Sequence, residues 1–135
     1  MNARDLLFKT GRFNLTVVKD HFINPCCFGE DLAAWLRDKL VAKGVKSSGP
    51  GQEDWGWYLK VNYLRDSYFL GMSGNADQQG CDEGQWRIIV EKKRSVSQWI
   101  RGTGKILEND RVVLIIEEIL RAEPNFQDVH RERHL

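Results

Sequence analysis

Residues 53–58 carry the side chains best suited to chemistry, because Glu53 and Asp54 lead directly into three aromatic residues within four positions. A carboxylate pair beside aromatic rings could hold a sugar or another small molecule, with one carboxylate as general acid and the other as general base. Adjacent residues of a strand point to opposite faces, so these two carboxylates do not form an acid-base pair by themselves. A cleft built on Glu53, Asp54 and Tyr58, beside Trp57, therefore needs a second carboxylate from elsewhere in the chain.

A second group of residues could bind a partner through charge. Residues 87–105 contain six basic side chains against one acid, with Trp99 among them, and the loop at 73–85 is acidic. Such a basic and aromatic segment is typical of a surface for nucleic acid or for an acidic protein. The whole chain has 20 basic and 19 acidic residues, so it lacks the one-signed field that drives nucleic-acid or membrane-surface binding. We expect a protein partner, which would contact Asp77, Asp82, Glu83, Lys92, Lys93, Arg94 and Arg101.

The motifs that resemble phosphate or metal sites are incomplete. Residues 102–105 read Gly-Thr-Gly-Lys, but a phosphate-binding loop needs Gly where Trp99 stands and Ser or Thr where Ile106 stands. His130 and His134 are four positions apart, and a metal site needs a third and usually a fourth ligand. The sequence therefore predicts no metal and no cofactor.

The cysteines do not form a recognisable catalytic or zinc-binding pattern. Cys26 and Cys27 are adjacent, Cys81 is distant, and none has the spacing of structural zinc ligands. His21 lies near the pair in sequence, but no local signature of a nucleophile surrounds them. An odd number of cysteines with a vicinal pair favours a reduced, cytoplasmic setting.

The periodicity of apolar residues predicts the elements that must position these side chains. Alternation over 12–19, 55–64, 68–72 and 86–90 predicts four strands, with Trp55 and Trp57 on one packed face. Spacings of three and four residues predict helices over 30–43 and 109–122, and Ser95 could cap a short helical turn. Gly-rich and polar composition predicts loops at 46–52 and 73–85.

The order of these elements predicts one α+β domain spanning residues 1–135. We expect two layers, a mainly antiparallel sheet of four to five strands with two helices on one face, in the order β-α-β-β-β-α. Residues 1–11 and 127–135 are candidates for loose ends, unless the second segment adds a final edge strand. The predicted shared core consists of Trp35, Leu36, Leu40, Trp57, Leu59, Ile88, Val113, Ile116 and Leu120.

Two segments resemble a known family in their order along the chain. NPCCFGEDLAAWL at 24–36, followed by PGQEDWGWYL at 50–59, resembles a small bacterial domain family of unknown function. The resemblance covers roughly the middle two thirds of the chain. It implies a bacterial, cytosolic, stand-alone α+β domain and assigns no activity.

A small, charge-segregated chain without a complete catalytic set favours a non-catalytic protein-binding domain, toxin-neutralising (immunity-like) or regulatory, rather than an enzyme. The alternative is a small hydrolase or a sugar-binding or small-molecule-binding protein that uses Glu53, Asp54 and Trp57. A pocket that joins Glu53 or Asp54 to a distant carboxylate would favour this alternative. No targeting signal is recognisable at the N-terminus, and no apolar run approaches the roughly 18 residues of a membrane span.

Overall fold

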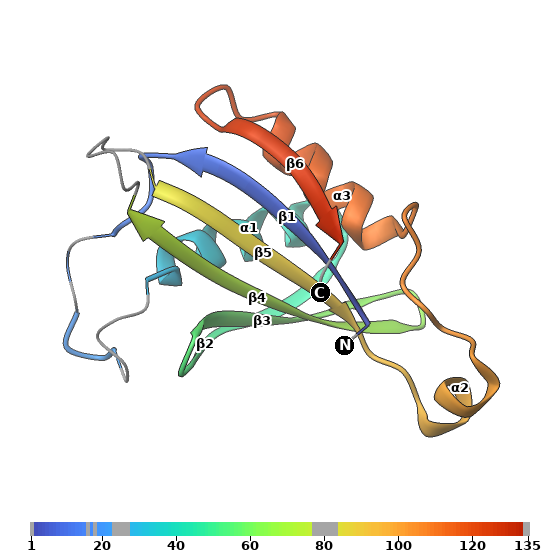
Figure 1. The fold of residues 1–135 in the computed structure, drawn as a ribbon. Coiled ribbons are helices and arrows are strands. Elements are labelled where there is room, and N and C mark those ends of the chain that lie inside the picture. Colours follow the sequence, from blue (N-terminus) through green and yellow to red (C-terminus); the bar gives the residue numbers. More distant parts are fainter. Residues whose placement is uncertain (1, 16, 18, 23–27, 77–83, 134–135) are drawn as a thin grey trace.

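Six antiparallel strands form one sheet in the order β2-β3-β4-β5-β1-β6 (Figure 1). The computed structural model describes residues 2–15, 17, 19–22, 28–76 and 84–133. The strands are β1 (Ala3–Thr10), β2 (Lys46–Glu53), β3 (Gly56–Tyr63), β4 (Asp66–Ala76), β5 (Gly84–Lys92) and β6 (Gln127–Arg133). The helices are α1 (Glu30–Ala42), α2 (Val96–Arg101) and α3 (Arg111–Arg121). The predicted α+β class with an antiparallel sheet is confirmed, although the sheet has six strands instead of four to five.

Helices α1 and α3 lie on the same side of the sheet, which we call the helix-covered face (Figure 1). Alternation within the strands sends Phe8, Leu59 and Ile88 toward these helices, where all three are buried. Eight of the nine predicted core residues are buried, and the ninth, Trp35, packs against them partly exposed. The prediction of the core is therefore confirmed.

The two long helices begin at residues that suit a helix N-terminus. The Asp110 carboxylate caps α3 by accepting hydrogen bonds from the backbone N–H groups of Val112 and Val113. Glu30 and Asp31 in the first turn of α1 favour the positive end of the helix dipole. These are the boundaries that capping signals predict to within two residues.

The prediction for the N-terminal region is wrong. The first strand covers Ala3–Thr10, within the segment that was a candidate for a loose end, and no strand occupies the described part of 12–19. Asp5 is fully buried on the face opposite the helices, where the Arg87 guanidinium pairs with it. A charged residue in the middle of a strand hides the apolar alternation, and its partner lies far away in the sequence.

Two predicted loops are strands wherever the structure describes them. Residues 46–52 belong to β2, an edge strand whose residues are all exposed or half-buried. Its Ser, Gly and Pro residues give it the composition of a loop. Strand β4 continues to Ala76 and β5 begins at Gly84, both inside the predicted loop at 73–85. At the C-terminus, residues 127–133 form the second edge strand, β6, which is the alternative that the sequence left open to a loose end.

Trp55 does not share the packed face with Trp57, as the alternation predicted. It lies in the turn between β2 and β3, and 45% of its surface is exposed, whereas Trp57 is buried. The strand begins only at Gly56, so Trp55 is outside the alternation of β3. Within the described ranges, no helix is long and apolar enough to cross a membrane.

Candidate functional site

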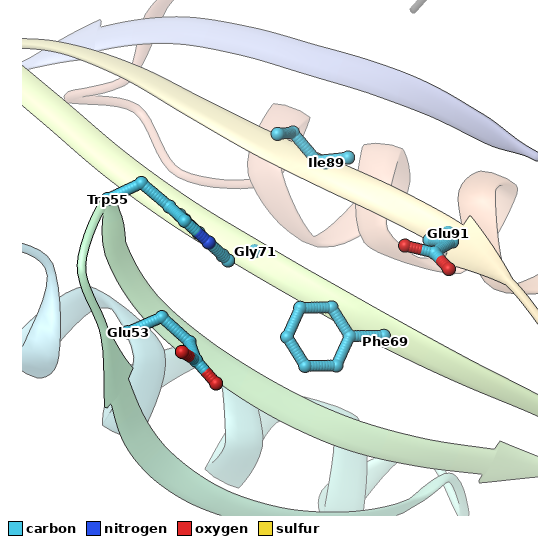
Figure 2. Close-up of a pocket in the computed structure, with 6 residues that line it drawn as sticks. All are labelled: Glu53, Trp55, Phe69, Gly71, Ile89 and Glu91. Carbon is cyan, nitrogen blue, oxygen red and sulfur yellow. The ribbon is translucent and has the colours of Figure 1, made fainter. Parts of the chain in front are cut away.

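The side of the sheet away from α1 and α3, the open face, carries a pocket of about 370 Å³ (Figure 2). This volume is within the range of small-molecule sites. Its walls come from the β2–β3 turn region and from β4 and β5. The lining residues are Glu53, Trp55, Phe69, Gly71, Ile89 and Glu91.

The register of the sheet brings these side chains together. Phe69 of β4 is directly opposite Glu91 of β5, and Gly71 is directly opposite Ile89. All four belong to the half of the alternation that points away from the helices. Apolar and acidic groups from two strands therefore lie side by side on the open face.

The Trp55 indole forms a further wall of the pocket, in space that is free because Gly71 has no side chain. A Cβ atom at position 71 would lie only 2.5 Å from the indole of Trp55, so the indole rests on the strand backbone. The Phe69 ring lies 6.2 Å from the Trp55 ring and stacks on Tyr58 at 5.0 Å. The result is an aromatic surface that remains partly open to solvent.

The two carboxylates of the pocket have different surroundings. Glu53 is exposed and has no ion-pair partner among the described residues. Glu91 lies 3.8 Å from the ammonium group of Lys93, which also lies 5.5 Å from the centre of the Phe69 ring. One end of the pocket thus holds a cation of the chain itself.

The predicted cleft is assembled only in part. Glu53 lines the pocket, but Asp54 is exposed in the turn and is not a lining residue. Tyr58 supports Phe69 from the side, and Trp57 lies on the helix-covered face. The second carboxylate that the alternative function required is Glu91.

Sequence reasoning missed Glu91 as a site residue. Its alternation with Ile89 places both on one face of β5, but only the strand order shows that this face meets Glu53. Among the described residues that line the pocket there is no Ser, Thr, Cys or His. The groups of this lining that could take part in chemistry are the carboxylates of Glu53 and Glu91.

A second candidate site is the segment of residues 93–107, which we call the 93–107 lobe. Helix α2 lies in it, away from the sheet (Figure 1), and buries none of its residues. The exposed fractions are 75% for Val96, 67% for Trp99 and 72% for Ile100. The lobe contains four basic residues and no Asp or Glu: Lys93, Arg94, Arg101 and Lys105.

Polar contacts hold the lobe in place, together with Ile106, its one residue in the hydrophobic core. The Asn2 amide donates hydrogen bonds to the carbonyls of Lys92 and Gly104, and its oxygen accepts one from the backbone N–H of Ile106. Within the lobe, Ser95 and Gln98 form a reciprocal capping box at the start of α2. The apolar side chains of α2 are not needed to fix its position.

Lys92 lies at the base of the lobe, where it pairs with carboxylates of the fold itself. Its ammonium group lies 3.5 Å from Asp66 and 3.8 Å from the buried Asp110. The Tyr68 hydroxyl donates a 2.9 Å hydrogen bond to Asp110. Burial, together with this hydrogen bond, holds the pKa of Tyr68 well above its usual value.

The other predicted partner-binding residues divide between the lobe and the undescribed part of the chain. Lys93, Arg94 and Arg101 lie in the lobe together with Trp99. The predicted acidic contacts Asp77, Asp82 and Glu83 lie outside the described residues, as do His134 and the three cysteines.

Comparison with known proteins found no matching family model, no matching curated protein and no matching solved structure. The functional argument accordingly depends on the geometry and charge of the pocket and the lobe.

Proposed function

We propose that this protein is a non-catalytic protein-binding domain whose 93–107 lobe docks on an acidic surface of its partner. The observation that carries the proposal is that α2 buries none of its side chains, although three of its six residues are large and apolar. Clustered apolar side chains on a protein surface are typical of interaction sites. The lobe therefore has the character of a contact surface.

The chemistry of the lobe indicates the kind of partner. Trp and Arg are enriched among the residues that dominate protein interfaces, and Trp99 and Arg101 lie two positions apart here. The four cations of the lobe would attract a negatively charged surface and accelerate its association. A net charge of only +1 for the whole chain favours a local acidic patch on a protein over the continuous phosphate backbone of a nucleic acid.

The biological role that we propose is toxin-neutralising or regulatory, since each acts by occupying a partner without turnover. Support comes from the exposed lobe, whose apolar and basic side chains are left for a partner. The alternative of a small-molecule-binding protein is favoured by one observation, the pocket that joins Glu53 to Glu91.

The test compares protein complexes recovered with four versions of the chain expressed in its native host. They are the wild type, the Trp99→Ser/Ile100→Ser double variant, the Arg101→Glu/Lys105→Glu double variant, and the control Leu64→Ser. Leu64 is 86% exposed in the turn between β3 and β4, outside the lobe. Quantitative mass spectrometry should find a stoichiometric acidic partner with the wild type and the control, and little of it with either lobe variant.

The purified partner then allows the contacts to be separated kinetically. Charge reversal at Arg101 and Lys105 should lower the association rate about tenfold or more at low salt, with a smaller effect at high salt. Recovery of the same partner with all four versions would contradict docking through the lobe. Tight binding of the wild type to anionic lipid vesicles, without any protein partner, would also contradict it.

A further inference from the structure

We propose that the pocket on the open face binds an aliphatic diammonium ligand, with one ammonium group at Glu53 and the other at Glu91. This site lies on the open face, and the only residue that it shares with the 93–107 lobe is Lys93, whose ammonium group lies near Glu91. It requires no protein partner, so its test is independent of the proposed function.

The apolar part of the pocket suits a methylene chain. Phe69 and Ile89 supply the floor, and the outer edge of the Trp55 indole lies against Gly71, so that the indole forms a wall (Figure 2). An alkyl chain laid across these groups would lose contact with water and gain contact with carbon atoms. A fully polar ligand would gain little from this surface.

The charged groups lie at the margins of the apolar floor. Figure 2 shows Glu53 and Glu91 on opposite sides of Phe69, approaching the pocket from β2 and β5. A ligand with a cation at each end and an apolar middle matches this order of charge, hydrocarbon and charge. The faces of Trp and Phe also attract cations, which reinforces the preference for ammonium groups.

Lys93 already shows the chemistry at one end of the pocket. Its ammonium group contacts Glu91 at 3.8 Å and lies above the Phe69 ring at 5.5 Å, on an alkyl stem of its own. Glu53 has no such cation among the residues that the structure describes. A diammonium ligand would supply the cation at Glu53 and would compete with Lys93 at Glu91.

The experiment titrates the purified wild-type protein with three compounds of matched length: 1,5-diaminopentane, n-pentylamine and 1,5-pentanediol. Binding is followed by calorimetry and by the NMR signal of the Trp55 indole N–H, assigned with Trp55→Phe. The diamine should bind about fivefold or more tightly than the monoamine, and the diol should not bind measurably. Equal binding of the diol and the diamine would overturn the proposal.

Variants separate the contributions of the two ends. Glu53→Gln and Glu91→Gln should each weaken diamine binding about fivefold or more, while Glu118→Gln, an exposed carboxylate on α3, should leave it unchanged. Lys93→Gln should strengthen diamine binding, because it removes the internal competitor at Glu91. Unchanged affinity in Glu53→Gln, or weaker binding in Lys93→Gln, would overturn the proposal, provided that thermal melting shows both variants to be folded.

A last titration tests whether the pocket binds a free diamine or a lysine side chain of a protein. N-acetyl-lysine methylamide presents one ammonium group on the same kind of stem, flanked by peptide groups. It should bind less tightly than 1,5-diaminopentane, because it offers nothing to the second carboxylate. Tighter binding of the lysine derivative would assign the pocket to a lysine of a protein partner and would overturn the diamine assignment.

Discussion

On the helix-covered face of the sheet Trp57 is 4% exposed, whereas in the 93–107 lobe Trp99 is 67% exposed. The first side chain contributes to folding, since burying a large apolar side chain stabilises a fold by about 1.5–3 kcal/mol. Trp99 contributes little free energy of burial to folding, and α2 is held instead by the capping box and by Asn2 at the base of the lobe. The contrast separates residues that make the fold from residues that are left for a partner.

The open face lies between these extremes. Phe69 and Ile89 are half-buried, and Trp55 covers Gly71 while nearly half of it remains exposed. This face is organised by the strands but is not covered by a helix. We therefore expect substitutions on the open face to alter ligand binding more than stability. Substitutions on the helix-covered face should alter stability more than ligand binding.

The largest effect is expected for Trp57→Ala. Removing a buried Trp loses its transfer free energy and leaves a cavity, which together cost about 3–5 kcal/mol. The total stability of a domain is typically about 5–15 kcal/mol, so a sizeable fraction of the molecules could unfold. Urea unfolding of the Trp57→Ala and Trp55→Ala variants compares their losses of unfolding free energy. The loss should be much smaller for Trp55→Ala. Wild-type stability of Trp57→Ala, combined with lost partner binding, would move Trp57 from the core to a recognition surface.

A smaller effect is expected when the two faces of β4 are compared directly. A Cβ atom at Gly74 would lie 2.3 Å from the ring of Trp86, which is buried and cannot swing away. Gly74→Ala should therefore cost about 1–3 kcal/mol, as overpacked core sites do. Gly71→Ala meets the Trp55 ring at 2.5 Å, but this partly exposed ring can move into solvent. Thermal melting should rank the two variants clearly, and equal losses would show that Trp55 is as firmly packed as Trp86.

The helix-covered face was largely predictable from the sequence, and the reason is local. In α1, apolar residues at spacings of three and four, with acids at the start, specify the helix and its buried side without reference to the rest of the chain. The same holds for α3 and its Asp110 cap. These patterns lie within a dozen residues, so no knowledge of the strand order is needed.

The candidate site was much less predictable, because it depends on contacts between distant segments. Asp5 is buried inside a strand, where Arg87 from a distant segment pairs with it. Glu91 and Glu53 line one pocket only because β2–β5 lie in order across the sheet. The place of Trp55 depends on where a turn ends, which alternation does not show. Sequence reasoning therefore found one carboxylate of the pocket and placed its tryptophan on the wrong face.

The third prediction concerns pH and the base of the lobe. Burial and the hydrogen bond to Asp110 raise the pKa of Tyr68 in the folded state above the value of about 10 for an unfolded chain. Stability from this group is fully present below pH 10 and is lost as the pH rises above it, because the unfolded chain releases the proton first. Tyr68→Phe should reduce the fall in unfolding free energy between pH 9 and 11, while costing about 1 kcal/mol at pH 7. An identical fall in both proteins would show that Tyr68 does not cause it.

The smallest effect on stability is expected for Trp99→Ser/Ile100→Ser. Both side chains are mostly exposed and α2 buries no residue, so the unfolding free energy should stay within about 0.5 kcal/mol of the wild type. The same double variant should lose the partner, so binding and stability would separate most clearly here. Urea unfolding at pH 7 with Leu64→Ser as the control measures it. A loss of more than about 1.5 kcal/mol would mean that α2 packs on the body in solution. The exposed apolar surface that supports docking would then be part of the core, and the contrast between Trp57 and Trp99 would disappear.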